Sequence, residues 1–507
     1  MYFNASHAAV RSSMENQGLK RRLSLLDAFA IVAGTTIGSG IFIVSSAITG
    51  AVRSPALLLL VWIAASVMSL TGALTIAELA AMMPAAGGQY IFLREAYGRM
   101  CAFLFGWTVV AVIHTGSVAA VAIVFAKYLG IVAPAVHSQF RVGPISMPGE
   151  RLVGIALVFL LTAANIRGLH AGRAVQNLFT FSKISALAVI VLFALVIAPN
   201  RAALHANFGS AAAFFGSRRI SVAIVPAFGA AMIGALFSLG GSENLIALGS
   251  EVRNPGRALP VALISGAVLV IVLYLLTNLA YLSQLPVLGD PGAPSVFERG
   301  ISGAQSGRVV AATMEVLWGT AGAHSTAVLV MVSTVGCLNG LILGGARLMY
   351  AMAHDRVFFR IASRLNDASV PSFALMIQAL WASMLALSGD FGDLLNYLGA
   401  AGSLFGILTI AAVFVMRAKR PAAHRPYRAW GYPYVPAVHM AGSLAILLDL
   451  ILVKPKYSLF GLLIVASGFP VYFWLSRSAD SERPILSELP GLMTESGVTE
   501  PGADTIS

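Results

Sequence analysis

The apolar residues of this chain fall into long continuous runs separated by short polar segments, along almost its whole length. Runs near or above the ~20 residues that a helix needs to cross a bilayer recur about twelve times, with no long soluble insert between them. Hydrophobic residues make up 58% of the sequence and charged residues only 11%, unlike soluble domains. The pattern predicts an all-α integral membrane protein with about twelve transmembrane helices.

The first apolar run, residues 25–51, contains the stretch GTTIGSGIF at positions 34–42. Its glycines and hydroxyl residues allow a helix to stop and restart at membrane depth, where lipid tolerates free backbone only around a cavity. Carbonyls freed at the end of the first half-helix suit an ammonium group, and N–H groups freed at the start of the second half suit a carboxylate. The alternative is an unbroken span in which Gly34 and Gly38 form a small-residue packing face.

A second unusual stretch, FSLGGSEN at positions 237–244, lies within the sixth apolar run, residues 221–250. It brings a glycine pair, hydroxyls, a carboxyl and an amide to mid-membrane. Its distance from Gly38 is about that of a repeat of five spans with their loops, and interrupted helices at corresponding positions are the best sequence pointer to a transporter site. We therefore expect spans one and six to be discontinuous helices.

The net charge of +12 comes from basic residues in short loops between the apolar runs. The positive-inside rule explains this placement, so the charge indicates topology and no nucleic-acid partner. The basic segment at 20–22 precedes an apolar run that is too long for a signal peptide. We expect a multi-pass protein of the plasma (bacterial inner) membrane with both termini in the cytoplasm and no cleaved signal.

The expected organisation has five parts. A disordered cytoplasmic N-terminus, residues 1–23, precedes a first five-helix repeat at 24–198. A second five-helix repeat at 199–416 leads to helices eleven and twelve at 417–478. Residues 479–507 are rich in Gly, Pro, Ser and Thr and are expected to form a disordered cytoplasmic tail.

Two ionisable side chains fall inside predicted spans. His114 lies near the middle of span three, where it is either a functional group or, more commonly, a neutral histidine hydrogen-bonded between helices. Lys183 lies about one turn inside span five; it could snorkel to the surface, but flanking serines favour a polar interior face. Cys101 and Cys337 are expected to be packing residues, with no metal site and no disulfide.

With these features placed, residues 24–474 resemble the amino acid-polyamine-organocation superfamily of secondary transporters, particularly bacterial members close to the L-type amino acid transporter branch. The motifs that carry the resemblance are GSGIF at 38–42, Pro84 with GGQY at 87–90, EVRNP at 251–255, Arg347 with YAMA at 350–353, and RPYRAWGYP at 425–433.

This resemblance implies two inverted five-helix repeats that move substrate by alternating access. It places the substrate carboxylate on the N–H groups of Ser39 and Gly40, beside Gly38. The amine would meet carbonyls around Thr35, Thr36, Phe237, Ser238 and Gly240, and Phe237 matches the aromatic residue that closes over the substrate. Lys183 resembles the lysine that replaces a sodium ion in sodium-independent members, so sodium independence is expected.

Three features depart from the L-type pattern. Glu243 aligns with an acidic position of the cationic amino acid and arginine/agmatine branches, and it could couple protons, recognise an amine or form a static pair. The role of His114 does not transfer from L-type relatives. The pair at 402–403, Gly-Ser, replaces a bulkier pair in some L-type members and could reshape the side-chain pocket.

The leading hypothesis is a sodium-independent permease or exchanger of neutral amino acids, with protons as a candidate co-substrate. The alternative is a proton-coupled carrier of cationic amino acids or polyamines. A membrane amino acid sensor is a third reading, disfavoured because the loops hold no signalling domain. The sequence shows no metal-ligand spacing, nucleophile elbow or phosphate loop, so neither an enzyme nor a cofactor is expected. No disulfide-linked subunit is expected, since neither cysteine lies in an obvious outer loop.

Overall fold

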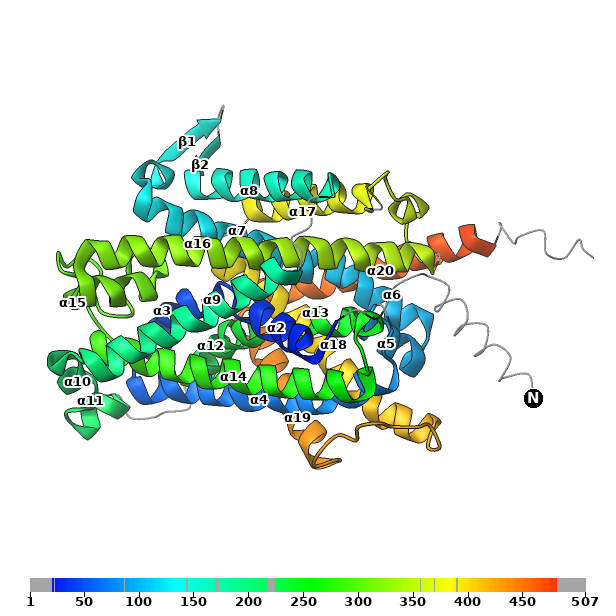
Figure 1. Ribbon diagram of the computed structural model, residues 1–507, viewed down its shortest axis with the longest axis horizontal. Helices are drawn as coiled ribbons and strands as arrows, with labels where there is room; N and C mark the ends of the chain where they lie inside the picture. The colour runs from blue at the N-terminus through cyan, green and yellow to red at the C-terminus, as the bar shows by residue number, and fades with distance from the viewer. Residues whose placement is uncertain are drawn as a thin grey trace, which may run out of the picture.

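A computed structural model describes residues 21, 23–85, 87–142, 145–168, 173–216, 224–355, 357–368, 370–388 and 391–480. These residues form a bundle of long helices that run roughly along one direction (Figure 1). The predicted disordered segments, 1–23 and 479–507, lie almost entirely outside the described residues.

The major helices, in chain order, are α2 (Leu25–Thr36), α3 (Val44–Val52), α4 (Pro55–Met82), α5 (Gln89–Tyr97), α6 (Arg99–Thr108), α7 (His114–Val132), α8 (Gly149–Ile166), α9 (Arg173–Leu192), α10 (Arg201–Phe208), α11 (Ala211–Phe215), α12 (Ile224–Leu239), α13 (Ser242–Ala247), α14 (Pro255–Gln284), α15 (Val296–Arg299), α16 (Val309–His354), α17 (Ser372–Ser388), α18 (Phe391–Lys419), α19 (Tyr434–Val453) and α20 (Pro455–Asp480). The short helical turns are η1 (Gly40–Phe42), η2 (Val109–Ile113), η3 (Pro134–His137), η4 (Phe193–Ile197), η5 (Gly249–Glu251), η6 (Gln305–Gly307) and η7 (Arg360–Ser363).

Within the described residues, 10 helical segments are long and apolar enough to cross a membrane, and two shorter apolar helices, α12 and α17, accompany them. The predicted helical membrane fold with about twelve spans is confirmed. Helix α16 begins at Val309 but is kinked at Trp318 and Gly319, where Gly319 adopts a φ of 63°.

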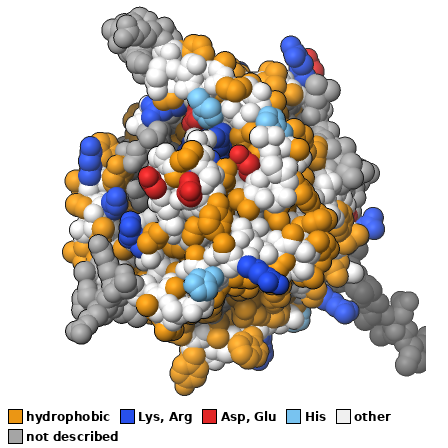
Figure 2. Space-filling model, turned by 90° about the vertical axis from the view of Figure 1, so that its left-hand side faces the viewer, with side chains coloured by type: hydrophobic (Ala, Val, Ile, Leu, Met, Phe, Trp, Pro, Cys, Tyr) orange, Lys and Arg blue, Asp and Glu red, His pale blue; other side chains and the backbone are white. Residues whose placement is uncertain are grey.

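One element departs from the all-helical prediction among the residues described. Strands β1 (Gln139–Val142) and β2 (Ile145–Pro148) form an antiparallel hairpin between α7 and α8. The hairpin projects from the end of the bundle that also carries α10, α11 and α15 (Figure 1). Viewed onto that end, charged side chains of both signs lie among hydrophobic ones (Figure 2).

Buried charges join several helices through the predicted basic loops. Glu78 of α4 is only 1% exposed, and Arg417 of α18 donates to its two carboxylate oxygens at 3.0 and 2.6 Å. The backbone N–H of Ala429 donates to the same carboxylate at 2.7 Å. Arg425 lies 3.3 Å from it. A buried carboxylate requires such partners, so the RPYRAWGYP motif fixes the segment before α19 against α4.

The first half-helix lies at the centre of this bundle. Helix α2 starts with a capping box, in which Asp27 N–H donates to Ser24 Oγ at 3.2 Å and Ser24 N–H donates to Asp27 Oδ2 at 2.9 Å. It packs against α9 on one side and α14 on another, and α13 also contacts it (Figure 1). The end of α2 is therefore surrounded by other helices rather than by lipid.

Candidate functional site

The first helix break occurs where the sequence predicted it. Helix α2 ends at Thr36, and the chain becomes helical again only at Gly40. Between them the N–H of Ile37 still donates to the Ala33 carbonyl at 2.8 Å, and that of Gly38 turns back to Thr36 at 2.7 Å. Span one is therefore discontinuous, and the unbroken alternative is wrong.

Lys183 of α9 meets the carbonyls that this break leaves free. Its ammonium group, on a side chain only 6% exposed, donates to the carbonyls of Gly34 at 3.1 Å and Ile37 at 3.2 Å. One turn away, Thr180 donates to the Ala30 carbonyl at 3.1 Å. The lysine thus points inward rather than snorkelling, and it ties α9 to the end of α2.

Three buried tyrosines from other helices satisfy further carbonyls of the same break. The pairs are Tyr274 Oη with Thr36 at 2.9 Å, Tyr281 Oη with Ile41 at 3.1 Å, and Tyr128 Oη with Phe42 at 2.9 Å. Sequence reasoning missed all three. Tyr274 and Tyr281 are seven residues apart on α14, which places both on one face, so the spacing was available as a signal.

Several donors at the first break remain unused. Among the described residues, no hydrogen-bond partner reaches the N–H groups of Ser39, Gly40 and Ile41. The Ser39 hydroxyl is buried, with the residue 1% exposed, and also has no partner. Since buried donors are almost always paired, this group of donors at a helix start fits an anion such as a carboxylate.

The second break separates α12, which ends at Leu239, from α13, which begins at Ser242. Gly240 N–H turns back to the Phe237 carbonyl at 3.2 Å. Gly241 has a φ of 142°, which only glycine adopts without strain. Its carbonyl accepts from the Thr35 hydroxyl at 3.0 Å, which links the second break to the first.

The two breaks touch each other through their glycines. A Cβ on Gly40 would lie 2.9 Å from Ser238 Cα, and one on Gly241 would lie 2.7 Å from the Thr36 nitrogen. Neither site has space for a side chain. The glycines therefore allow the two backbones to approach, and they bring the free N–H groups near Ser39 together with the end of α12.

The carbonyls predicted to hold an amine divide into two groups. Thr36 and Phe237 already accept backbone or tyrosine donors. Among the described residues, no donor reaches the carbonyls of Ser238 and Gly240, while Thr35 receives only the Cys337 thiol at 3.9 Å. Three acceptors thus remain beside the free donors.

Helix α16 forms a third wall that the sequence analysis did not assign to the site. A Cβ on Gly38 would lie 3.2 Å from Cys337 Sγ, and one on Gly344 would lie 3.2 Å from Asn244 Oδ1. Gly340 lies between Cys337 and Gly344 on the same helical face, and a Cβ there would meet nothing within 4 Å. Open space therefore lies beside Gly340, on the face of α16 that carries Cys337 and Gly344. Glycines spaced four apart at 336, 340 and 344 were the available signal.

The other predicted site residues occupy the border of this region. His114 hydrogen-bonds through Nε2 to the Leu341 carbonyl of α16, as expected for a histidine between helices. Glu243 is exposed, and its carboxylate accepts from Gly241 N–H at 3.0 Å. Glu243 lies in the first turn of α13 and faces accessible space. Phe237 is half-buried on the last turn of α12.

Comparison with known proteins agrees with this architecture. Residues 23–483 match the family model described as amino acid permease. A serine/threonine exchanger of Bacillus subtilis is 29% identical over 473 residues, covering 91% of this chain and 98% of the relative. The human b(0,+)-type amino acid transporter 1 is 30% identical over 462 residues, covering 90% and 88%. The mouse large neutral amino acids transporter small subunit 2 is 29% identical over 459 residues, covering 90% and 81%.

These relatives are transporters and not enzymes, and the matched segment spans both helix breaks and all the described transmembrane helices. The resemblance drawn from the sequence motifs is confirmed. The chain belongs to the amino acid permease family.

Proposed function

We propose that this chain exchanges neutral amino acids across the membrane by alternating access, without sodium. The observation that carries the proposal is the pairing of unused donors at the first helix break with unused acceptors at both breaks. A zwitterionic amino acid is the ligand that needs both within a few ångströms.

The substrate carboxylate would bind the N–H groups of Ser39 and Gly40 with help from the Ser39 hydroxyl. Its amine would bind the carbonyls of Thr35, Ser238 and Gly240. Among the described residues, none of these groups has a strong hydrogen-bond partner, so binding replaces no strong internal hydrogen bond. Phe237, one residue before Ser238, is proposed to cover the bound substrate.

Sodium independence is supported by the position of Lys183. Its ammonium group bonds the carbonyls of Gly34 and Ile37, which are oxygen ligands of the kind that a cation requires. A second cation at this place would meet both an occupied ligand set and like-charge repulsion in a medium of low dielectric constant.

The substrate side chain is proposed to occupy the open space at Gly340. Cys337 and Gly344 bound this space along α16, and Asn244 and His114 border it near Gly344. The names of two relatives, a serine/threonine exchanger and a large neutral amino acids transporter, support uncharged substrates. Small and medium neutral side chains are therefore the first candidates.

The topology is proposed with both termini in the cytoplasm of a bacterial cell. The predicted basic loops meet at one end of the bundle, where Arg94 lies 2.8 Å from Asp355 and Arg420 lies 2.7 Å from Glu95. Clustering of arginines at one end is what the positive-inside rule requires of the cytoplasmic side.

Glu243 supports a second candidate, the transport of cationic amino acids or polyamines. Its carboxylate is exposed beside the second break, and among the described residues no basic side chain pairs with it. A substrate ammonium or guanidinium group could bind there.

Counterflow in proteoliposomes tests both candidates. Purified protein is loaded with unlabelled alanine, serine, leucine or arginine, and uptake of each labelled amino acid is followed with and without Na⁺ and a pH gradient. Uptake of neutral amino acids that depends on internal neutral amino acid and ignores Na⁺ is expected. A requirement for Na⁺ would refute the role of Lys183, and uptake of arginine alone would favour the cationic candidate.

A further inference from the structure

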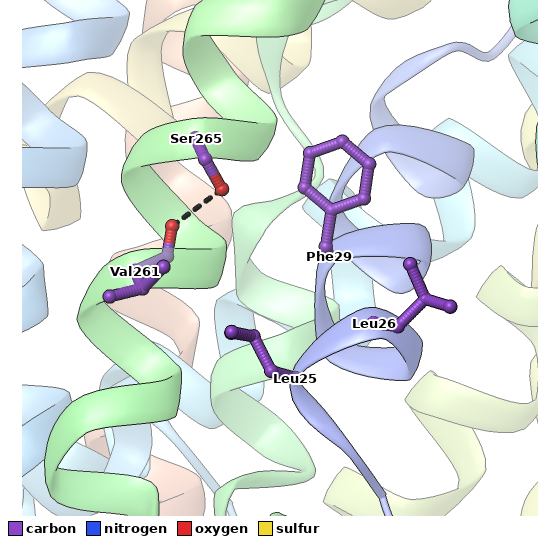
Figure 3. Close-up of a pocket in the computed structure, with 5 residues that line it drawn as sticks. All are labelled: Leu25, Leu26, Phe29, Val261 and Ser265. Carbon is purple, nitrogen blue, oxygen red and sulfur yellow. Dashed lines mark hydrogen bonds between the residues drawn. The ribbon is translucent and has the colours of Figure 1, made fainter.

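A groove of about 390 Å³ opens between the start of α2 and the first turns of α14, away from the substrate site. Leu25, Leu26 and Phe29 of α2 line one side, and Val261 and Ser265 of α14 line the other (Figure 3). Its lining is almost wholly apolar, because the Ser265 hydroxyl donates to the Val261 carbonyl at 2.6 Å within its own helix. The groove therefore offers contact area to hydrocarbon and no hydrogen bond.

The groove exists because α2 and α14 touch at Gly266 and diverge from there toward their N-terminal ends. At Gly266 the helices are in contact: a Cβ there would lie 2.7 Å from Val32 Cγ1. Toward their starts the helices separate, and Leu25, Leu26 and Val261 are left 47%, 57% and 42% exposed. A bilayer supplies acyl chains to such an open apolar wedge, since the surrounding solvent there is lipid.

The end of the groove is basic. Arg257 lies four residues, about one helical turn, before Val261 on the same face of α14, and it is exposed. Arg253 and Arg21 are also exposed and are held together, because Arg253 Nε donates to the Arg21 carbonyl at 3.4 Å. Among the described residues, no carboxylate pairs with these arginines.

Backbone pairing fixes this basic end at the groove mouth. Leu23 N–H donates to the Glu251 carbonyl at 2.9 Å, and Arg253 N–H donates to the Leu23 carbonyl at 2.9 Å. The nearby carboxylates are engaged elsewhere: Asp27 accepts from Ser24 and from Asn177, and Glu251 lies 3.7 Å from Arg347. Among the described residues, neither carboxylate pairs with Arg253 or Arg257, so positive charge predominates where the apolar groove ends.

We propose that this groove binds one anionic phospholipid from the leaflet at that end of the bundle. One acyl chain lies between α2 and α14, and the phosphate lies at Arg253 and Arg257. The charge at the mouth selects an anionic headgroup over a zwitterionic one. Because α2 leads into the first helix break, the lipid adds a contact that holds this half-helix against α14. Binding itself does not depend on the proposed transport activity.

Native mass spectrometry of the full-length protein tests this proposal. The detergent-purified chain is incubated with equal amounts of phosphatidylglycerol and phosphatidylcholine, and bound lipid is counted. One phosphatidylglycerol is expected to bind preferentially. The double variant Arg253→Gln/Arg257→Gln should weaken its retention about thirtyfold, since each arginine near an anionic lipid contributes roughly a factor of five. The matched variant Arg360→Gln/Arg364→Gln removes two exposed arginines of another loop at the same end and should leave retention unchanged.

Two further binding experiments distinguish recognition of the whole lipid from recognition of its headgroup alone. Ser265→Trp fills the groove and should abolish the preferred lipid, while glycerophosphoglycerol, which has the headgroup without acyl chains, should not compete. Equal losses in both arginine pairs would reduce the effect to general charge attraction and overturn the proposal. Competition by the free headgroup, or full retention in Ser265→Trp, would also overturn it. Because the readout is binding, a failure of transport does not affect the result.

Discussion

At both helix breaks, backbone groups lose their helical hydrogen-bond partners, and the two breaks replace these partners differently. At the first break, a lysine from α9 and tyrosines from α7 and α14 satisfy the freed carbonyls. At the second break, Gly241 is satisfied by Glu243, two residues further on, and by Thr35 of the first break. The first break is therefore anchored to the surrounding bundle, and the second mainly to itself and to the first.

This difference indicates which part of the site moves. Segments with few hydrogen bonds to the rest of a protein open at lower free energy than segments held by many. Alternating access requires one half-helix to shift against another. We expect α13 and the glycines before it to rearrange more than residues 37–42, and the following variants test this contrast.

The largest effect is expected from Lys183→Met, which removes the main anchor of the first break. The carbonyls of Gly34 and Ile37 lose their donor, and each buried carbonyl left unpaired costs about 1–3 kcal/mol. Exchange in proteoliposomes should fall by about a hundredfold or more, and the melting temperature should drop. The exposed Lys456 provides the control, because Lys456→Met removes the same charge from the surface. Normal exchange by Lys183→Met would mean that the first break needs no outside anchor.

The next largest effect is expected from Gly340→Val, which tests the role of the open space beside α16. Gly340→Val places two methyl groups and a Cβ where nothing now lies within 4 Å. If the substrate side chain occupies this space, crowding should cost larger substrates about 1–3 kcal/mol, so threonine and leucine exchange should fall at least about fivefold relative to glycine. Gly50→Val in α3, which also has open space, is the matched control. Equal losses for all substrates would place the substrate side chain elsewhere.

A smaller effect is expected from Tyr274→Phe. The variant removes the hydroxyl that donates to Thr36 but keeps the ring, and Thr36 retains the Gly38 N–H. A single lost hydrogen bond of this kind costs about 1 kcal/mol, so exchange should slow about fivefold with a modest loss of thermal stability. Tyr434, which is 77% exposed, supplies the control variant Tyr434→Phe. A stronger effect than that of Lys183→Met would reverse the ranking of the anchors.

The sequence predicted the breaks because glycine is required at both. Gly40 and Gly241 allow two backbones to approach, and no other residue fits. Lys183 was predictable as an interior group because a charge within an apolar span must find partners. The number of spans followed from the length of the apolar runs.

The anchors themselves could not be predicted in the same way. Tyrosine in an apolar span is ordinary, and which carbonyl Tyr128 or Tyr274 reaches depends on how α7 and α14 pack against the break. The role of Gly340 depends on the packing of α16 beside both breaks, which the sequence alone does not show. The exposure of Glu243 also could not be predicted, because it depends on the accessible space in front of α13.

The smallest effect is expected from Glu243→Gln, which tests the local anchor of the second break. A glutamine carbonyl can still accept from Gly241 N–H, so the turn into α13 is kept while the charge is lost. Exchange of neutral amino acids should change by less than about threefold, because one hydrogen bond is exchanged for a similar one. Glu298→Gln, at another exposed carboxylate, is the control. If neutral exchange instead collapses while Glu298→Gln is normal, the charge of Glu243 takes part in transport, and the second break depends on more than its own backbone.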